Sequence, residues 1–119
     1  MKNLLVLSLA VFLFSMNAVW AQSIPKPSIN LSGTIATTNT FQQIQGQNGG
    51  RNGCTVQNIT TSDNQWVYFG ACASATKASS VLLAPGQSVS CSLPGSDIVL
   101  SDTVCITGTG ADSFFANFQ

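Results

Sequence analysis

The residues of this chain best suited to covalent chemistry are its four cysteines, Cys54, Cys72, Cys91 and Cys105. They are too widely spaced for a zinc-binding pair or a Cys-x-x-Cys redox motif, and the sequence has no histidine. An even number of separated cysteines instead predicts two disulfides, provided that the chain is exported to an oxidising compartment. The spacing alone leaves three pairings open.

Groups for acid–base catalysis are scarce. The sequence lacks glutamate as well as histidine, so a Ser-His-Asp relay is impossible and the acidic candidates are Asp63, Asp97, Asp102 and Asp112. Asp97 and Asp102 flank a short expected strand and could form a glycosidase-like carboxylate pair. Both positions also suit turn residues at strand ends, which is the interpretation that we favour. We therefore predict no catalytic residue, no cofactor and no metal site.

Aromatic residues are concentrated in one run, Gln65–Phe69 (QWVYF), which predicts a strand. Alternation places Trp66 and Tyr68 on one face of that strand and Val67 and Phe69 on the other. Val67 and Phe69 are the better core pair, which leaves Trp66 and Tyr68 partly exposed.

Exposed aromatic rings on a strand stack on sugars or anchor a protein partner. We therefore take Trp66 and Tyr68, with Gln57 and Asn64 as nearby polar groups, as the candidate binding residues. The alternative is that Trp66 covers the edge of the core or lies under the N-terminal segment. The C-terminal Phe114, Phe115 and Phe118 raise the same question, because a terminal edge strand that exposes some of them would be an association surface.

The first 21 residues have the layout of a secretory signal peptide. A short basic start with Lys2 precedes an apolar stretch at 4–15, and Ala21 offers a small residue at the cleavage position. The apolar stretch is too short for a membrane span. We predict cleavage after Ala21, a secreted, periplasmic or extracellular location, and an oxidising environment for the cysteines.

Charge is scarce in this chain. Four cations balance four anions, and the cations beyond the signal are the scattered Lys26, Arg51 and Lys77. They cannot form the basic patch that neutralises phosphates, which excludes nucleic acid as a partner. A net charge near zero also gives little repulsion between copies of the chain.

Short runs rich in Thr, Val and aromatic residues recur along the chain between Gly, Pro, Asn and Asp clusters. The expected strands are 33–37, 40–45, 54–60, 65–69, 79–83, 87–93, 98–100, 103–107 and 113–118, with a short helical turn within 71–78 and a turn at Pro85–Gly86. This pattern predicts an all-β fold, a small disulfide-stapled antiparallel β-sandwich or a jelly-roll-like barrel. We expect a signal at 1–21, an extended leader at 22–40 and the sandwich at 41–119.

Strand parity reduces the open disulfide pairings to one. Cys54 and Cys91 are in phase with apolar neighbours on their own strands, so both should point into the core. Cys105 is out of phase with its apolar neighbours and Cys72 follows a strand end, so both should lie at a margin. We therefore predict the pairs Cys54–Cys91 and Cys72–Cys105.

Several loose motifs lie between about Phe41 and Gln119. They are Arg51 before a strand that ends in Gln57–Asn58, an aromatic strand that ends in Phe69–Gly70, the pair Ala75–Thr76, and a Leu-x-x-Pro-Gly turn at 82–86. In these motifs the chain resembles a small β-sandwich module of phage virion and tail-associated proteins and of short secreted bacterial proteins of unassigned role. The resemblance implies no catalytic residues. The signal peptide and the four cysteines depart from the phage pattern and favour the secreted bacterial type.

The sequence thus predicts an exported, non-enzymatic structural or interaction module of the cell surface or extracellular space, with self-association as one mode of action. The alternatives are a carbohydrate-binding module that uses the exposed strand aromatics, and a virion-associated decoration protein. The candidate partners are a second copy, another surface protein or a polysaccharide.

Overall fold

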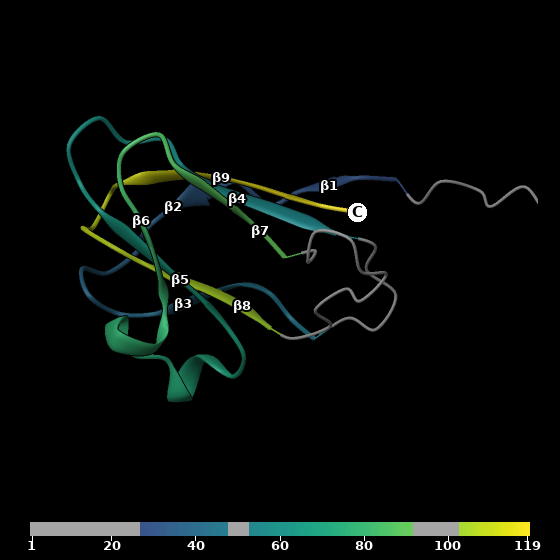
Figure 1. The fold of residues 1–119 in the computed structure, drawn as a ribbon, viewed down its shortest axis with the longest axis horizontal. Coiled ribbons are helices and arrows are strands. Elements are labelled where there is room, and N and C mark those ends of the chain that lie inside the picture. The colour runs from purple at the N-terminus through teal and green to yellow at the C-terminus, as the bar shows by residue number, and fades with distance from the viewer. Residues whose placement is uncertain (1–26, 48–52, 92–102) are drawn as a thin grey trace, which may run out of the picture.

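A computed structural model of the chain describes residues 27–47, 53–91 and 103–119 (Figure 1). The expected signal peptide, Arg51, and the expected strand at 98–100 with its flanking Asp97 and Asp102 lie outside these residues. The interpretation of Asp97 and Asp102 as turn residues, and its carboxylate-pair alternative, therefore stay untested.

Within the described ranges the chain forms nine short strands and two single 3₁₀ turns. The strands are β1 (Ile29–Asn30), β2 (Gly33–Thr34), β3 (Gln42–Gln45), β4 (Cys54–Asn58), β5 (Gln65–Phe69), β6 (Val81–Leu83), β7 (Ser88–Ser90), β8 (Val104–Thr107) and β9 (Ser113–Phe118). The 3₁₀ turns are η1 (Cys72–Ser74) and η2 (Lys77–Ser79), within the segment expected to form a short helical turn.

The strands form two antiparallel sheets that pack face to face (Figure 1). Sheet A has the order β1-β9-β4-β7, with β2 also paired to β9, and sheet B has the order β3-β8-β5-β6. The edge strands β6 and β7 contact each other, so β1 and β3 lie at the opposite side of the sandwich. The predicted all-β sandwich is confirmed.

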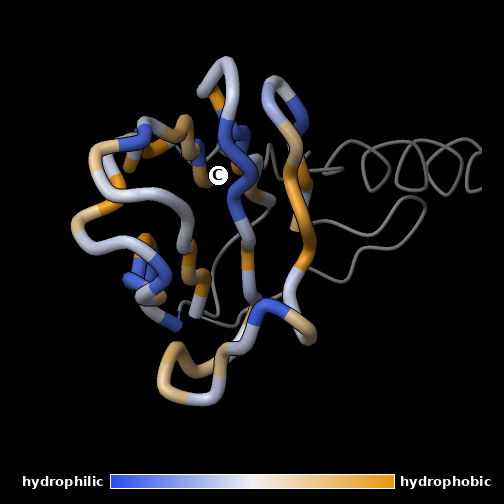
Figure 2. The backbone as a smooth tube through the Cα atoms, turned by 90° about the vertical axis from the view of Figure 1, so that its left-hand side faces the viewer, coloured by the Kyte–Doolittle hydropathy of each residue, from blue (hydrophilic) through white to orange (hydrophobic). Residues whose placement is uncertain are grey.

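Alternation along the strands builds the core between the sheets. In β4, Cys54, Val56 and Asn58 are buried while Thr55 and Gln57 are only partly buried, the period of two expected of a strand with one face inward. Figure 2 shows apolar and hydrophilic residues interleaved along the backbone. The buried apolar residues that pack together are Ile35, Cys54, Val56, Val67, Leu83, Cys91, Val104, Ile106, Phe114, Ala116 and Phe118.

The segment expected to be a leader takes part in the sandwich. β1 pairs with the end of β9, with Ile29 opposite Phe118, and β2 pairs with its start, with Gly33 opposite Phe114. The side chain of Ile35 is only 1% exposed and belongs to the core. Because β1 and β2 cover β9, the expectation of an exposed C-terminal edge strand is wrong.

Two disulfides fasten the sandwich, and they join the cysteines that strand parity pairs. Cys54 and Cys91 connect β4 to the end of β7 inside the core, with their Cα atoms 5.1 Å apart. Cys72 and Cys105 connect η1 to β8, with their Cα atoms 5.7 Å apart. Cys105 is fully buried although it lies outside the core cluster, because the chain after β5 folds over it.

Candidate functional site

The outer face of sheet B carries the aromatic pair that the sequence singled out. Val67 is buried and Phe69 packs against the core, so Trp66 and Tyr68 point away from the core and are half-buried, as alternation predicts. The Tyr68 ring meets the Phe41 ring edge to face, with the ring centroids 6.4 Å apart. Part of the aromatic surface is therefore used within the chain.

The ring of Trp66 also has a partner within the chain. The ammonium of Lys77 lies 3.9 Å from the ring centroid, within the range of a cation–π interaction. The same Nζ donates a 2.6 Å hydrogen bond to Asn39 Oδ1, which fixes the lysine head over the ring. A sugar that stacks on this side of Trp66 has to displace Lys77.

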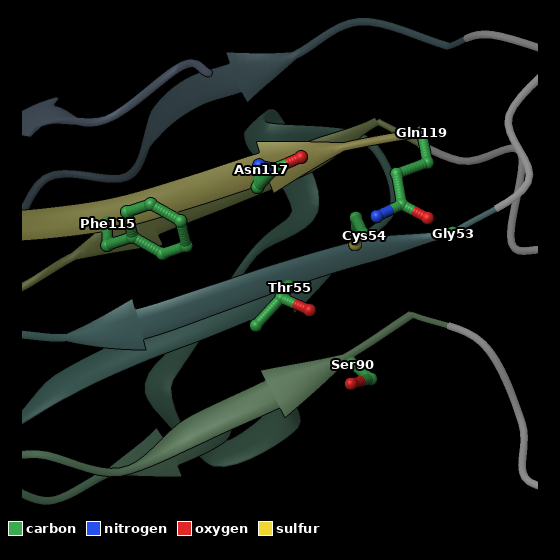
Figure 3. A pocket seen from close by; sticks show the side chains of 7 residues that line it. All are labelled: Gly53, Cys54, Thr55, Ser90, Phe115, Asn117 and Gln119. Atoms are coloured by element: carbon green, nitrogen blue, oxygen red, sulfur yellow. The ribbon is translucent and has the colours of Figure 1, made fainter. Parts of the chain in front are cut away.

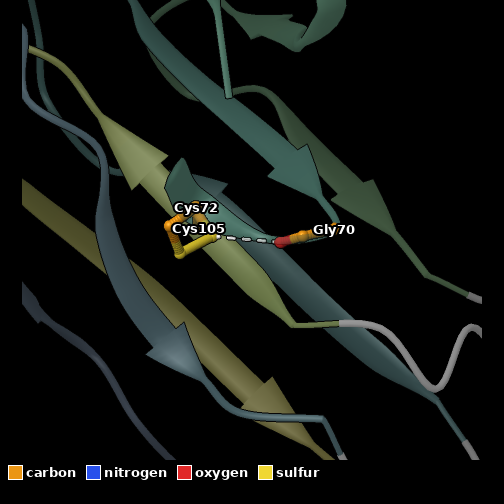
Figure 4. Close-up of a disulfide and its surroundings, with 3 residues drawn as sticks. All are labelled: Gly70, Cys72 and Cys105. Carbon is orange, nitrogen blue, oxygen red and sulfur yellow. Dashed lines mark hydrogen bonds between the residues drawn. A yellow bond between two sulfur atoms is a disulfide. The ribbon is translucent and has the colours of Figure 1, made fainter. Parts of the chain in front are cut away.

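Lys77 belongs to a segment, residues 70–80, that crosses the outer face of sheet B and that we name the strap. Its second turn is held by a capping box in which Ser79 N donates to Thr76 Oγ1 and Thr76 N donates to Ser79 Oγ, both at 3.2 Å. The Cys72–Cys105 disulfide bonds the strap to β8 (Figure 4). These local bonds make the strap a fixed cover and not a loose loop.

The strap begins at Gly70, a position that suits only glycine. Its φ of +144° is in the region that side chains avoid, and a Cβ there would lie 2.9 Å from a carbon of the Tyr68 ring. Figure 4 shows the Gly70 carbonyl oxygen beside Cys105 Sγ, at 3.4 Å. A disulfide sulfur has no proton to donate, so this is a close contact that packs the start of the strap against the disulfide.

The other two candidate binding residues lie elsewhere. Gln57 points outward from β4 in sheet A, and its Nε2 donates a 3.1 Å hydrogen bond to the carbonyl oxygen of Gly86. Asn64 is exposed in the connection before β5. The structure therefore does not bring Trp66, Tyr68, Gln57 and Asn64 together into one site.

The outer face of sheet A contains a pocket that the sequence did not suggest. It has a volume of about 300 Å³ and is lined by Gly53, Cys54, Thr55, Ser90, Phe115, Asn117 and Gln119 (Figure 3). None of these residues is charged. Their side chains come from β4, β7 and β9 and from the residues next to them, which are far apart in the sequence, so no local motif marks them.

Neither of the two described aspartates, Asp63 and Asp112, lines this pocket. Asp63 accepts a 2.8 Å hydrogen bond from Ser62 Oγ and a 3.5 Å bond from Thr109 Oγ1. In the ranges described here, no three of the His, Cys, Asp and Glu side chains are placed to hold a metal ion. None of the helical segments in the same ranges is long and apolar enough to cross a membrane.

Large apolar side chains are exposed at two opposite edges of the sandwich. Ile29 on β1 is 52% exposed, and Val81 and Leu82 on β6 are 41% and 49% exposed. β1 is an edge of sheet A and β6 is an edge of sheet B at the other side of the molecule.

The described residues thus form a small all-β sandwich with two disulfides. No protein family model matches the chain, and no curated protein matches it. Among solved structures, it is similar to a chain from Bacillus endospore appendages, which are described as a novel family of disulfide-linked pili. The two share 20% identity with a TM-score of 0.47, over 77% of this chain and 81% of that chain.

Proposed function

We propose that this chain is an exported, non-enzymatic structural module of the cell surface or extracellular space that assembles with further copies of itself. The observation that carries the proposal is the position of Ile29 and of Val81 and Leu82, which are exposed on the two opposite edges of the sandwich. Two disulfides in so small a domain support a location outside the reducing cytosol.

Edge strands offer unpaired backbone N–H and C=O groups to another chain, and charged side chains are one of the ways in which proteins protect such edges. β6 (Val81–Leu83) and β1 (Ile29–Asn30) instead carry apolar residues and no charged ones. The two edges are different surfaces, so contact between the β1 edge of one copy and the β6 edge of the next is head to tail. Contacts of this kind produce open chains of subunits unless their rotation closes a ring.

The carbohydrate-binding alternative at Trp66 and Tyr68 is the weaker proposal. Lys77 and Phe41 already contact these rings, so a sugar gains less there than on a free aromatic surface. A virion-associated role has no support from the described residues and stays an alternative interpretation of the sequence.

Light scattering on the exported protein tests the self-association. We expect the average mass of the wild type to rise with concentration. Leu82→Lys and Ile29→Lys should each raise the association Kd at least about tenfold, because each places a charge in an apolar contact. Asn64→Lys adds the same charge at an exposed position outside both edge strands and should change little.

Mixing the two edge variants distinguishes head-to-tail assembly from other modes. Each variant keeps one intact edge, so an equimolar mixture of Ile29→Lys and Leu82→Lys should form dimers and no longer species. A wild type that stays monomeric at every concentration contradicts the proposal, as does equal weakening by Asn64→Lys.

A further inference from the structure

The register of sheet A places a row of uncharged hydrogen-bonding side chains across its outer face. Ser90 of β7 lies opposite Thr55 of β4, Thr55 lies opposite Asn117 of β9, and Asn117 lies opposite Asn30 of β1. Neighbouring strands are about 4.8 Å apart, which is close to the length of one pyranose unit. The hydroxyl and amide groups of the row therefore repeat at the spacing of sugar units in an extended chain.

Three residues of this row line the pocket on sheet A, together with an aromatic side chain. Figure 3 shows Thr55, Ser90 and Asn117 on three neighbouring strands, with Phe115 on the same strand as Asn117. The volume of about 300 Å³ lies at the lower end of the range for small-molecule sites. The side chain of Phe115 is partly buried and lies beside these polar groups. An aromatic ring can contact the apolar face of a sugar while neighbouring polar groups bond its hydroxyls.

Asn117 contributes an unmet hydrogen-bonding group. Its Oδ1 is buried and has no hydrogen-bond partner in the structure. The atom is covered from solvent, so a ligand reaches it only once the Asn117 side chain turns toward the pocket, where a donor recovers the desolvation cost of an unpaired acceptor. A sugar hydroxyl is such a donor, and the hydroxyls of Thr55 and Ser90 can each donate to and accept from the same ligand.

The charge of the site narrows the class of ligand. Among the described residues that line the pocket, none is a lysine, an arginine or an aspartate. An acidic or cationic ligand therefore finds no opposite charge among these residues, whereas a neutral one loses no strongly hydrated group on binding. We infer that the pocket on the outer face of sheet A binds a neutral glycan, with Thr55, Ser90 and Asn117 bonding its hydroxyls and Phe115 contacting one sugar ring. The pocket lies on the outer face of sheet A, whereas the proposed assembly uses the β1 and β6 edges, so glycan binding does not depend on that assembly.

Nuclear magnetic resonance titrations of the isotope-labelled exported protein test the inference. The probes are cellohexaose, xylohexaose, maltohexaose and chitohexaose, with an oligomer of galacturonic acid as the acidic comparator. We expect saturable shifts at the amides of Thr55, Ser90 and Asn117 from at least one neutral probe at concentrations up to about 10 mM, which fill most of a site with a Kd of about 1 mM.

Variants on the same face decide whether these side chains bind the probe. Asn117→Leu should weaken binding at least about tenfold, and Ser90→Ala should weaken it about threefold to tenfold, because each removes hydrogen bonds to the sugar. Ser88→Ala, on the same face of β7 but outside the pocket, is the matched control and should bind like the wild type. Ser90 is exposed, so its variant should fold even if Asn117→Leu does not.

Three results would overturn the inference. They are the absence of saturable shifts with all four neutral probes, shifts that centre on Trp66 instead of Asn117, and stronger binding of the acidic oligomer at this face. Equal affinity of the Ser90→Ala and Ser88→Ala proteins would also contradict it.

Discussion

The two outer faces of the sandwich differ in how far other parts of the chain cover them. The face of sheet B is aromatic, and the strap closes over it with Lys77 on Trp66 and a disulfide to Cys105. The face of sheet A is hydroxyl- and amide-rich, hollowed, and lined by uncharged residues. The aromatic residues that the sequence marks as the better candidates for binding are thus the ones whose surface is partly covered in the structure.

This difference shows that the type of a side chain predicts what it can contact, but not whether its contacts are already made. Trp66 and Tyr68 face outward as their strand parity requires, yet Lys77 and Phe41 take up part of their surface. The residues of sheet A are less conspicuous singly. They line one pocket because three strands place them side by side.

The largest expected effect concerns the two disulfides, one in the core at sheet A and one between sheet B and the strap. Both close loops of similar size, with sequence separations of 37 and 33, so the entropic contributions should be nearly equal. Cys54→Ala with Cys91→Ala also leaves a cavity in the core, and should lower the free energy of unfolding by about 3–5 kcal/mol. Cys72→Ala with Cys105→Ala should cost about 2–3 kcal/mol. Urea unfolding monitored by circular dichroism measures both, and a larger loss for the outer pair would reverse the comparison.

Gly70→Ala tests how tightly the strap is fixed to sheet B. The new Cβ meets the Tyr68 ring and the backbone stays at a positive φ, so we expect a loss of about 2–3 kcal/mol in unfolding free energy. Gly86→Ala is the control, because its φ is +79° but nothing lies within 4 Å of the added atom. That variant should lose only about 1 kcal/mol. Equal losses in thermal or urea unfolding would show that the contact with Tyr68 does not constrain the strap.

Lys77→Met should have the smallest effect and is the sharpest test of the cover over Trp66. It removes the cation but keeps an apolar side chain, and should cost about 0.5–1 kcal/mol of stability. The NMR signal of the Trp66 indole N–H should shift with it, while Lys77→Arg should restore both properties. An unchanged indole signal in the Met variant would mean that Lys77 does not lie on the ring in solution.

The parts of the fold that the sequence predicted are those with a local signal. In β4, β5 and β9, inward and outward residues alternate over five or six positions, so both the strands and their buried faces could be inferred. β1 and β2 are two residues long with exposed side chains, and form because the edge of β9 accepts them. A pairing between residues 29–34 and 113–118 produces no local alternation of polar and apolar residues, so the sequence does not predict it.

The candidate sites divide in the same way. The outward position of Trp66 follows from alternation in its own strand. The contact that covers its ring depends on Lys77, whose ammonium is held by Asn39 from a different loop. The pocket on sheet A depends on Thr55, Ser90 and Asn117, each an ordinary outward polar residue of its strand. Only the register between the strands brings them into one row.

The pairing of β1 with β9 has a mechanical consequence. Ile29 lies opposite Phe118, so a pull that separates these two positions opens the hydrogen bonds of the pair one after another instead of loading them together. β9 also leaves β4 from the same end, because Cys54 lies opposite Phe118. Peeling of this kind needs little force, but it stops at the covalent loops between Cys54 and Cys105. Under tension the domain should therefore first extend at low force, as the segments outside Cys54 and Cys105 peel away. Further extension should then be limited by the two disulfides.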